Sequence, residues 1–365
     1  MYPNLYVFLI ANPGIGKQVI ERVRHLWEEI VEPQTKILAL KVAPDSMTRA
    51  SFIDDLSAAK QTKIPPQGSP YVYHSLLITQ EEWAVLFPAY DLPFLSTLTA
   101  LWGNRELHRE TRRTGKVTNL LIQRPTLNIL AGYQPALMAT TFPEEAWAGG
   151  FTRRLVMVYS GSRPHRDLFF DAGGGEETRP ALLEKLSRLT GAYGQFQWNR
   201  DAAERASEWD ASGGQPAPNH PKLEHYLQSR TEMILKLSMI HAASRGALED
   251  KEYRIHLEDV ETAIKWLMEV EKAMPDIFRQ MTGKSDVQIL DELHYYVTAL
   301  YASRKAVPIP TEDIMQFLAE RAPTDRILKI YDIAEKAGYI SRIPGTDGPD
   351  ALWTPAPRRG PMGLQ

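Results

Sequence analysis

The segment that most constrains the fold of this 365-residue chain lies near its N-terminus. A short apolar run, Leu5–Ile10, has the composition of a buried strand, and helical spacing of apolar residues begins directly after the glycine-containing turn that follows. In a turn of this kind the backbone N–H groups point at a phosphate, and a lysine reaches the terminal phosphates of a nucleotide. We therefore predict a P-loop that binds ATP. After Ala11, its residues are Asn12, Pro13, Gly14, Ile15, Gly16 and Lys17.

Two positions of this turn differ from the usual pattern. Ala11 stands where the first glycine is expected, which changes little because alanine is small. Gln18 stands where a Ser or Thr hydroxyl normally holds Mg²⁺, and we keep it as a candidate metal neighbour although an amide is a poorer ligand. Phosphate binding follows from the loop itself, whereas efficient hydrolysis also depends on Gln18. The alternative is a plain glycine-rich turn between a strand and a helix.

Two acidic residues come directly after a second strand-like run, Ser75–Thr79. Carboxylates at the end of a strand near the P-loop can hold Mg²⁺ through water and polarise the attacking water molecule. We expect Glu82 to act as the catalytic base and Glu81 to occupy the metal position. The alternative is a pair of exposed acids at the start of a helix.

Three further residues are candidates for contact with the nucleotide. Gln134 follows the strand-like run Leu127–Ala131, where a polar side chain can sense the γ-phosphate. Arg154 precedes the last such run, and an arginine there can reach the nucleotide of a neighbouring subunit in a ring. Arg230 begins a helical pattern and could fold over the nucleotide as a second sensor. The alternatives are a turn residue for Gln134 and solvated surface charges for the two arginines.

The order of the segments predicts three domains. Residues 1–163 alternate strand-like and helix-like runs, which is typical of a doubly wound α/β sheet. Residues 164–283 begin with a linker composition and continue as a helical lid, and residues 284–355 have the helix–helix–helix–hairpin order of a winged helix. Residues 356–365 are expected to be disordered. The predicted fold is thus an AAA+-like P-loop NTPase with a parallel sheet, a helical lid and a C-terminal winged helix. Because the chain enters a strand at Leu5, we also expect that a natural N-terminal region precedes it.

The charge distribution restricts where a nucleic acid can bind. The formal net charge is −3, so such a surface must be a local patch. Arginine and lysine contacts to phosphates are independent of base sequence, and in ring ATPases a basic loop between these strands can line the pore. The candidates in the densest basic stretch are Arg109, Arg112, Arg113 and Lys116, and those in the predicted winged helix are Arg326 and Lys329. The alternatives are a solvated helix–loop with internal ion pairs and a winged helix that binds protein.

Composition excludes several classes of protein. The chain has no cysteine, so disulfides, cysteine zinc sites and thiol catalysis are excluded. No apolar run approaches the roughly 20 residues that a membrane span needs, and the N-terminus lacks a secretory signal pattern. We expect a cytoplasmic protein without a membrane partner.

With these residues in place, the chain resembles a family of phage and prophage replication ATPases, primase- or helicase-like proteins of the AAA+ and ring-helicase group. The matching segments are Ala11–Lys17, Ala43–Ala50, Glu82 with Phe87–Asp91, Leu130–Pro135, Gly150–Arg154 and Ile234–Met239. The resemblance implies an ATP- and Mg²⁺-dependent DNA helicase or translocase in a bacterial host or phage-infected cell. It implies a hexameric ring with nucleotide between subunits, single-stranded DNA as the track, and a primase or other replication protein as partner.

A second interpretation stays open. Members of this family usually carry Ser or Thr after the P-loop lysine, so Gln18 also fits a nucleotide-switched replication initiator or helicase loader with little turnover. A small-molecule kinase is a third possibility, but the sequence offers no evident acceptor site for it.

Overall fold

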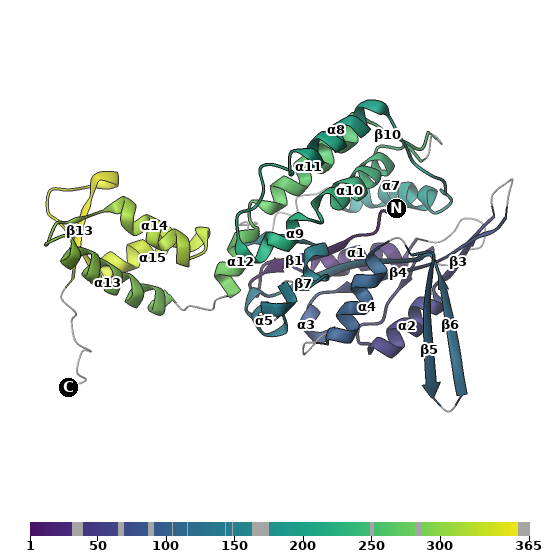
Figure 1. The fold of residues 1–365 in the computed structure, drawn as a ribbon, viewed down its shortest axis with the longest axis horizontal. Coiled ribbons are helices and arrows are strands. Elements are labelled where there is room, and N and C mark those ends of the chain that lie inside the picture. The colour runs from purple at the N-terminus through teal and green to yellow at the C-terminus, as the bar shows by residue number, and fades with distance from the viewer. Residues whose placement is uncertain are drawn as a thin grey trace. The chain divides into compact units, whose positions relative to one another are not determined.

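The chain divides into two compact units, Met1–Pro275 and Asp276–Gln365, which are described separately (Figure 1). The computed structural model describes residues 1–30, 39–64, 69–86, 91–103, 105–114, 116–142, 144–147, 149–162, 175–248, 252–281 and 286–356. Residues 164–174 of the predicted linker, 164–181, and residues 357–365 of the predicted disordered tail, 356–365, lie outside the described residues, whereas 175–181 are helical and not a linker.

A mostly parallel sheet forms the centre of the first unit. Its strands are β1 (Tyr6–Ala11), β2 (Lys41–Val42), β3 (Lys60–Lys63), β4 (Tyr71–Gln80), β7 (Pro125–Tyr133) and β8 (Leu155–Ser160). The order is β2-β4-β7-β1-β8, and all of these neighbours are parallel, whereas β3 pairs antiparallel with β4. The predicted α/β class with a mainly parallel sheet is thus confirmed.

Helices follow the strands at the positions where local sequence signals start them. They are α1 (Val19–Glu28), α2 (Arg49–Ala58), α3 (Trp83–Leu86), α4 (Leu92–Trp102), α5 (Pro135–Thr141) and α6 (Glu144–Trp147), with a 3₁₀ turn, η1, at Thr152–Arg154. The Thr48 side chain accepts a hydrogen bond from the Ser51 amide and caps α2, while Asp91 caps α4 in the same way. These caps satisfy amide groups that the helices leave unpaired at their first turns.

Aromatic side chains fill the space beside the centre of the sheet. The Phe8 ring on β1 lies 4.9 Å from the Trp83 ring and 6.0 Å from the Tyr133 ring, measured between centroids. All three residues are buried, and Phe142 packs against Tyr133 at 5.8 Å. This packing fixes the ends of β1, β4 and β7 relative to one another.

Two antiparallel strands leave the sheet between α4 and β7. They are β5 (Leu107–Thr114) and β6 (Lys116–Gln123), which form a two-stranded sheet of their own and extend as an arm in Figure 1. The sequence favours a loop or a helix–loop as the secondary structure of this basic stretch, and the structure has two paired strands instead. A turn signal, Thr114-Gly115-Lys116, between two runs containing β-branched residues could have indicated a hairpin.

The remainder of the first unit is mainly helical. Its elements are α7 (Gly175–Leu189), α8 (Arg200–Ala211), η2 (Pro221–Leu223), α9 (Glu224–Leu227), α10 (Arg230–Ser244) and α11 (Leu257–Glu271), with a short parallel pair, β9 (Gln197–Trp198) and β10 (Arg254–Ile255). Helix α10 packs along α11, and α11 also contacts β8. The helical segment and the sheet therefore belong to one compact unit.

The second unit has its own core. Its elements are α13 (Asp286–Ser303), β11 (Ile309–Pro310), α14 (Thr311–Arg321), α15 (Thr324–Lys336), β12 (Ile340–Arg342), η3 (Gly348–Asp350) and β13 (Leu352–Pro355), while α12 (Met274–Met281) crosses the boundary between the units. The strands pair antiparallel in the order β11-β13-β12. Leu293, Ile314, Ile330 and Trp353 are fully buried in this core.

Candidate functional site

The carboxyl ends of three neighbouring strands bring the predicted catalytic residues together. Strands β4, β7 and β1 are adjacent and parallel, with Gln80 paired to Ala131 and Ile10 paired to Tyr133. In a parallel sheet, ligands bind outside these ends because the loops that follow the strands converge there. Lys17 of the predicted P-loop, the two acids and the predicted sensor Gln134 follow these three strands.

Lys17, Glu82 and Gln134 form one contact cluster, named here the Glu82 cluster. The Lys17 ammonium nitrogen lies 2.9 Å from Glu82 Oε2, and Gln134 Nε2 donates to the same oxygen at 2.8 Å. The Lys17 and Glu82 side chains are only 13% and 25% exposed, so water screens this ion pair less than it would a surface pair. The other carboxylate oxygen, Oε1, is buried and has no hydrogen-bond partner among the described residues. This oxygen can therefore accept a hydrogen bond from an additional polar group or a water molecule.

The loop between β1 and α1 has the conformation that its glycines allow. Gly14 has a φ of +83° and Gly16 a φ of +52°, values at which other residues are strained. A Cβ atom at either position would meet no atom within 4 Å, so conformation rather than crowding requires glycine here. Among the described residues, no acceptor is found for the backbone N–H groups of Gly14, Gly16 and Lys17.

The start of α1 adds to the anion-binding character of this loop. Gln18 is the N-cap of this ten-residue helix, and its side chain makes no capping hydrogen bond. Unpaired amides and the positive end of the helix dipole both stabilise an anion. The loop residues from Asn12 to Gln18 therefore fit a phosphate group.

Gly132 was not predicted as a site residue, although it shapes the Glu82 cluster. A Cβ atom at this position would lie 2.0 Å from the backbone oxygen of Glu81 and 3.1 Å from Lys17 Cδ. The β7 backbone can thus approach Glu81 closely only because residue 132 has no side chain. A glycine inside a strand pattern was the available signal, since such glycines mark close backbone approach.

The fit of the site to Mg²⁺ rests on few residues. Glu81 is half-buried beside Glu82, and Gln80 donates from Nε2 to the backbone oxygen of Asp45 at 2.9 Å. Asp45 itself forms an ion pair with Arg24 of α1. Among the described residues, no group of three or more His, Asp or Glu side chains is arranged to hold a metal. Mg²⁺ bound with a nucleotide often takes only one or two protein ligands, so Glu81 and Gln18 stay candidates.

Arg154 lies at the other edge of the sheet. It directly precedes β8, whose first residue pairs with the first residue of β1, so it sits at the amino-terminal ends of these strands. The side chain is half-buried, donates a hydrogen bond to the Gly150 oxygen, and lies over the Trp102 ring at 5.4 Å from its centroid. Burial lowers the Arg154 pKa. Within one chain, Arg154 is therefore separate from the Glu82 cluster.

Arg230 has a packing role instead of the predicted nucleotide contact. It is fully buried, and its Nε and Nη2 each lie 2.7 Å from a different oxygen of Glu271. Its other nitrogen donates to the Gly214 oxygen, and the guanidinium lies 4.9 Å from the Trp209 ring centroid. All three nitrogens are thus engaged within the helical segment. The sequence could not reveal this, because Glu271 lies 41 positions further along the chain.

The basic hairpin, β5 and β6, is held near its start by contacts at His108 and Glu110, a region named here the root. Arg49 of α2 makes two contacts with the Glu110 carboxylate, at 3.0 and 3.1 Å, and its Nε donates to Thr97 at 2.9 Å. His108 is buried at the same root, and burial lowers its pKa. Between His108 and Glu110, Arg109 is exposed and available to a ligand. The side chains of Arg112, Arg113 and Lys116 lie outside the described part of the chain.

The two candidates in the second unit differ from each other. Arg326 is half-buried and forms an ion pair with Asp286, so its charge is already partnered within the chain, which weakens the case for a nucleic-acid contact. Lys329 is exposed on α15, where its neighbour Leu328 is 70% exposed. Asp325 is also exposed on this helix. The face is therefore not uniformly basic, which weakens the case for phosphate contacts there.

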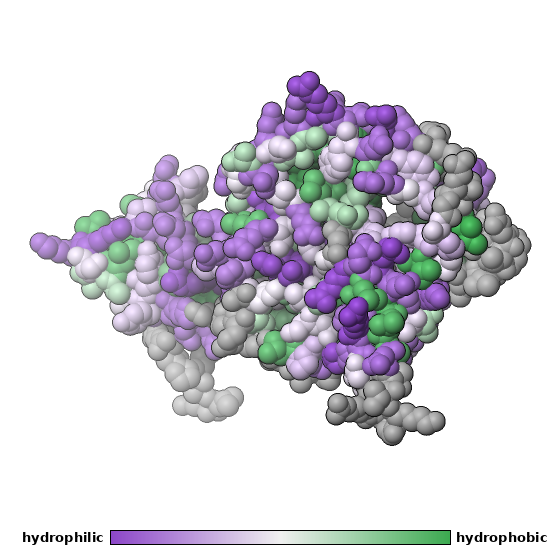
Figure 2. All heavy atoms as spheres, turned by 45° about the vertical axis from the view of Figure 1, so that its right-hand side comes forward, coloured by the Kyte–Doolittle hydropathy of each residue, from purple (hydrophilic) through white to green (hydrophobic). Residues whose placement is uncertain are grey.

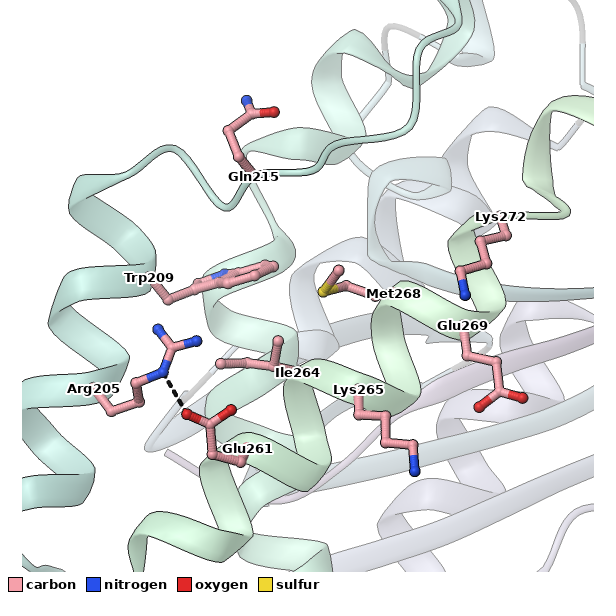
Figure 3. Close-up of a pocket in the computed structure, with 9 residues that line it drawn as sticks. All are labelled: Arg205, Trp209, Gln215, Glu261, Ile264, Lys265, Met268, Glu269 and Lys272. Atoms are coloured by element: carbon pink, nitrogen blue, oxygen red, sulfur yellow. Dashed lines mark hydrogen bonds and ion pairs between the residues drawn. The ribbon is translucent and has the colours of Figure 1, made fainter.

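A hollow of about 490 Å³ lies in the helical segment, between α8, α11 and the chain that follows α8 (Figure 3). Trp209, Ile264 and Met268 line it with apolar surface, while Arg205 and Glu261 form an ion pair of 2.6 Å at its side. None of its lining residues belongs to the predicted sites. Figure 2 shows hydrophobic residues scattered among hydrophilic ones on the visible face of the molecule.

Comparison with known proteins does not assign the chain to a family. The sequence matches no model of a known protein family, and no curated protein matches it. No helix in the described part of the chain has both the length and the apolar character needed to cross a bilayer. The interpretation of the site therefore rests on its geometry.

Proposed function

We propose that this chain is an ATPase whose nucleotide binds at the loop from Asn12 to Gln18, at the edge of an AAA+-like P-loop core. The observation that carries the proposal is the Glu82 cluster, in which one carboxylate oxygen is held by the loop lysine and by Gln134. The left-handed Gly14 and Gly16 beside it supply the flexible turn that a phosphate needs.

The contacts suggest how a nucleotide would change the cluster. A triphosphate offers Lys17 a stronger anionic partner than Glu82, so binding would draw the ammonium group away from the carboxylate. Glu82 would then be free to accept a proton from the water that attacks the γ-phosphorus, while the bond from that phosphorus to the ADP oxygen breaks. Gln134 would keep Glu82 oriented or turn to the γ-phosphate. When bound, Mg²⁺ would neutralise charge on the phosphates, with Glu81 and Gln18 as the nearest candidate ligands.

The ring and the DNA belong to the same proposal. Arg154 lies at the opposite edge of the sheet from the Glu82 cluster, a position from which it could serve a neighbouring subunit but not its own nucleotide. The hairpin, with Arg109 exposed, would contact the phosphates of single-stranded DNA. The three helices and antiparallel strands of the second unit are compatible with a winged helix, which would bind DNA or a replication protein such as a primase. The full proposal is a hexameric DNA helicase or translocase of phage or mobile-element replication, acting in the cytoplasm.

A nucleotide-switched initiator or helicase loader is the second candidate. It is favoured by Gln18 in the place of a metal-binding hydroxyl and by the direct pairing of Lys17 with Glu82, which keeps the base occupied. In that case ATP would be bound and would change the cluster, but turnover would be slow.

Binding and turnover distinguish the two candidates. We expect Lys17→Ala to weaken ATP binding by roughly 10- to 100-fold, because a hydrogen bond to a charged group contributes about 1.5–3 kcal/mol. Glu82→Gln should retain binding and lose turnover, and single-stranded DNA should stimulate turnover in the unmodified protein. The exposed Lys60→Ala is a matched control that should leave both unchanged.

The outcomes separate the proposals. Tight ATP binding with no turnover in the presence or absence of DNA supports the loader and rejects the helicase. Equal ATP affinity of the unmodified protein and Lys17→Ala, measured by calorimetry, rejects the nucleotide site itself.

A further inference from the structure

A buried lysine of the helical segment is bound to the amino-terminal edge of the sheet. Lys236, in the middle of α10, is fully buried. Its ammonium nitrogen lies 2.8 Å from Asn4 Oδ1, 3.2 Å from the Asn4 backbone oxygen and 3.1 Å from the Trp102 backbone oxygen. Three acceptors match the three N–H groups of an ammonium. This single side chain thus joins α10 to Asn4, two residues before β1, and to the last residue of α4.

The same lysine shares an aromatic ring with Arg154. The Lys236 ammonium lies 3.9 Å from the centroid of the Trp102 ring, and the Arg154 guanidinium carbon lies 5.4 Å from that centroid. Trp102 is 1% exposed, so solvent hardly screens these charges. Among the residues that the structure describes, Glu232 is the carboxylate found near them, 3.8 Å from Lys236. Two cations and one anion therefore meet around one indole.

Few direct contacts hold Arg154 itself. Its guanidinium donates to the Gly150 oxygen, and its Nε is buried with no hydrogen-bond partner among the described residues. A Cβ atom at Gly150 would lie 2.8 Å from Arg154 Nη1 and 2.8 Å from Thr99 Cγ2. The direction of the arginine thus depends on the ring of Trp102 and on the absence of a side chain at residue 150.

We propose that Lys236 and Trp102 are positioning residues, which couple the helical segment to Arg154 and set how that arginine is presented to the nucleotide of a neighbouring subunit. The inference rests on the proposed function. A displacement of α10 would move Lys236, and the shared ring would transmit the displacement to Arg154. The helical segment of one subunit would thereby control hydrolysis in the next subunit.

Mixed assemblies test this coupling, because a donor subunit can be changed without touching the site that is measured. Donor subunits carry Lys17→Ala, which weakens their own ATP binding, and are mixed with unmodified subunits. The second substitution in the donor is Lys236→Met, Arg154→Ala, Gly150→Ala or, as a control on the exposed face of α11, Lys265→Met. Donors are added in about tenfold excess, so that most unmodified subunits have a donor as their neighbour. Donors with the first three substitutions should then lower the kcat per unmodified subunit about fivefold to tenfold below that with the Lys17→Ala donor alone, with KM for ATP unchanged. The Lys265→Met donor should not lower it further.

A ring substitution provides a second measurement in case Lys236→Met does not fold. Trp102→Phe keeps an aromatic face for the cations and should retain more kcat than Trp102→Leu at similar thermal stability. If the Arg154→Ala donor lowers kcat while the Lys236→Met and Gly150→Ala donors do not, or if the two Trp102 variants have equal kcat, the coupling is refuted and the ATPase proposal stands. If unmodified subunits do not turn over ATP, both proposals are refuted.

Discussion

Replacing Gly132 by alanine would place a methyl group where the backbone of Glu81 already lies. The added carbon would be 2.0 Å from the Glu81 oxygen, well inside the usual contact distance of about 3.5 Å between non-bonded atoms. Backbone cannot yield as a flexible side chain can, so the chain after β4 must shift. Forcing extra volume into a packed site costs about 1–3 kcal/mol, which in a unit of this size lowers the melting temperature by roughly 3–10 °C.

The functional effect should exceed the effect on stability, because the displaced segment carries Glu82. A shift of about 1 Å removes the 2.9 Å contact between Lys17 and Glu82 and misplaces the candidate base. We expect Gly132→Ala to lose ATP turnover while retaining its circular dichroism spectrum. Gly103→Ala is the matched control, since a Cβ atom there meets nothing within 4 Å and the φ of −81° suits alanine. Unchanged melting temperature and turnover in Gly132→Ala would show that the close approach to Glu81 does not constrain the site.

Three further predictions concern other parts of the chain. Burial lowers the Lys236 pKa from 10.5 to about 8, so between these pH values the unfolded chain holds a proton that the folded chain lacks. The unfolding free energy of the unmodified protein relative to Lys236→Met should therefore rise by roughly 3 kcal/mol from pH 8 to 10.5, and a flat difference in denaturant titrations would contradict this. Glu271→Gln leaves the buried Arg230 charge without its partner and should lower the unfolding free energy by about 3–5 kcal/mol, measured in urea. Arg109→Ala should reduce the salt dependence of single-stranded DNA binding by a slope of about 0.7, and an unchanged slope would remove Arg109 from the DNA surface.

The sequence was most informative where the location of a side chain follows directly from its position after a strand. Lys17, Glu82 and Gln134 each come just after a buried strand, so their convergence could be predicted from the parallel sheet alone. The turn after β1 could also be predicted, because Gly14 and Gly16 adopt a left-handed backbone that favours glycine. These features depend mainly on residues close together in the sequence, so they can be predicted without knowing the tertiary contacts.

Features that depend on distant partners could not be predicted in this way. Arg230 resembled an exposed sensor, yet its role is set by Glu271, and no local pattern connects the two. Lys236 lies on a helical stripe, but its acceptors come from Asn4 and Trp102, more than a hundred positions earlier. The hairpin was missed because Arg and Glu alternate there in a way that suits a solvated helix as well as a strand.

The root of the hairpin has a mechanical consequence. Two nitrogens of Arg49, in α2, contact the Glu110 carboxylate. The chain before α2 accepts a hydrogen bond from Gln80, which lies at the end of β4 near the Glu82 cluster. From Glu110 to the end of β5 at Thr114, the strand extends about 14 Å. Because Glu110 is held and the far end is about 14 Å away, a small tilt at Glu110 would displace the far end of β5 most. A change at the rim of the sheet near the Glu82 cluster, passed on through α2 and Arg49, would therefore be largest at the far end of the hairpin.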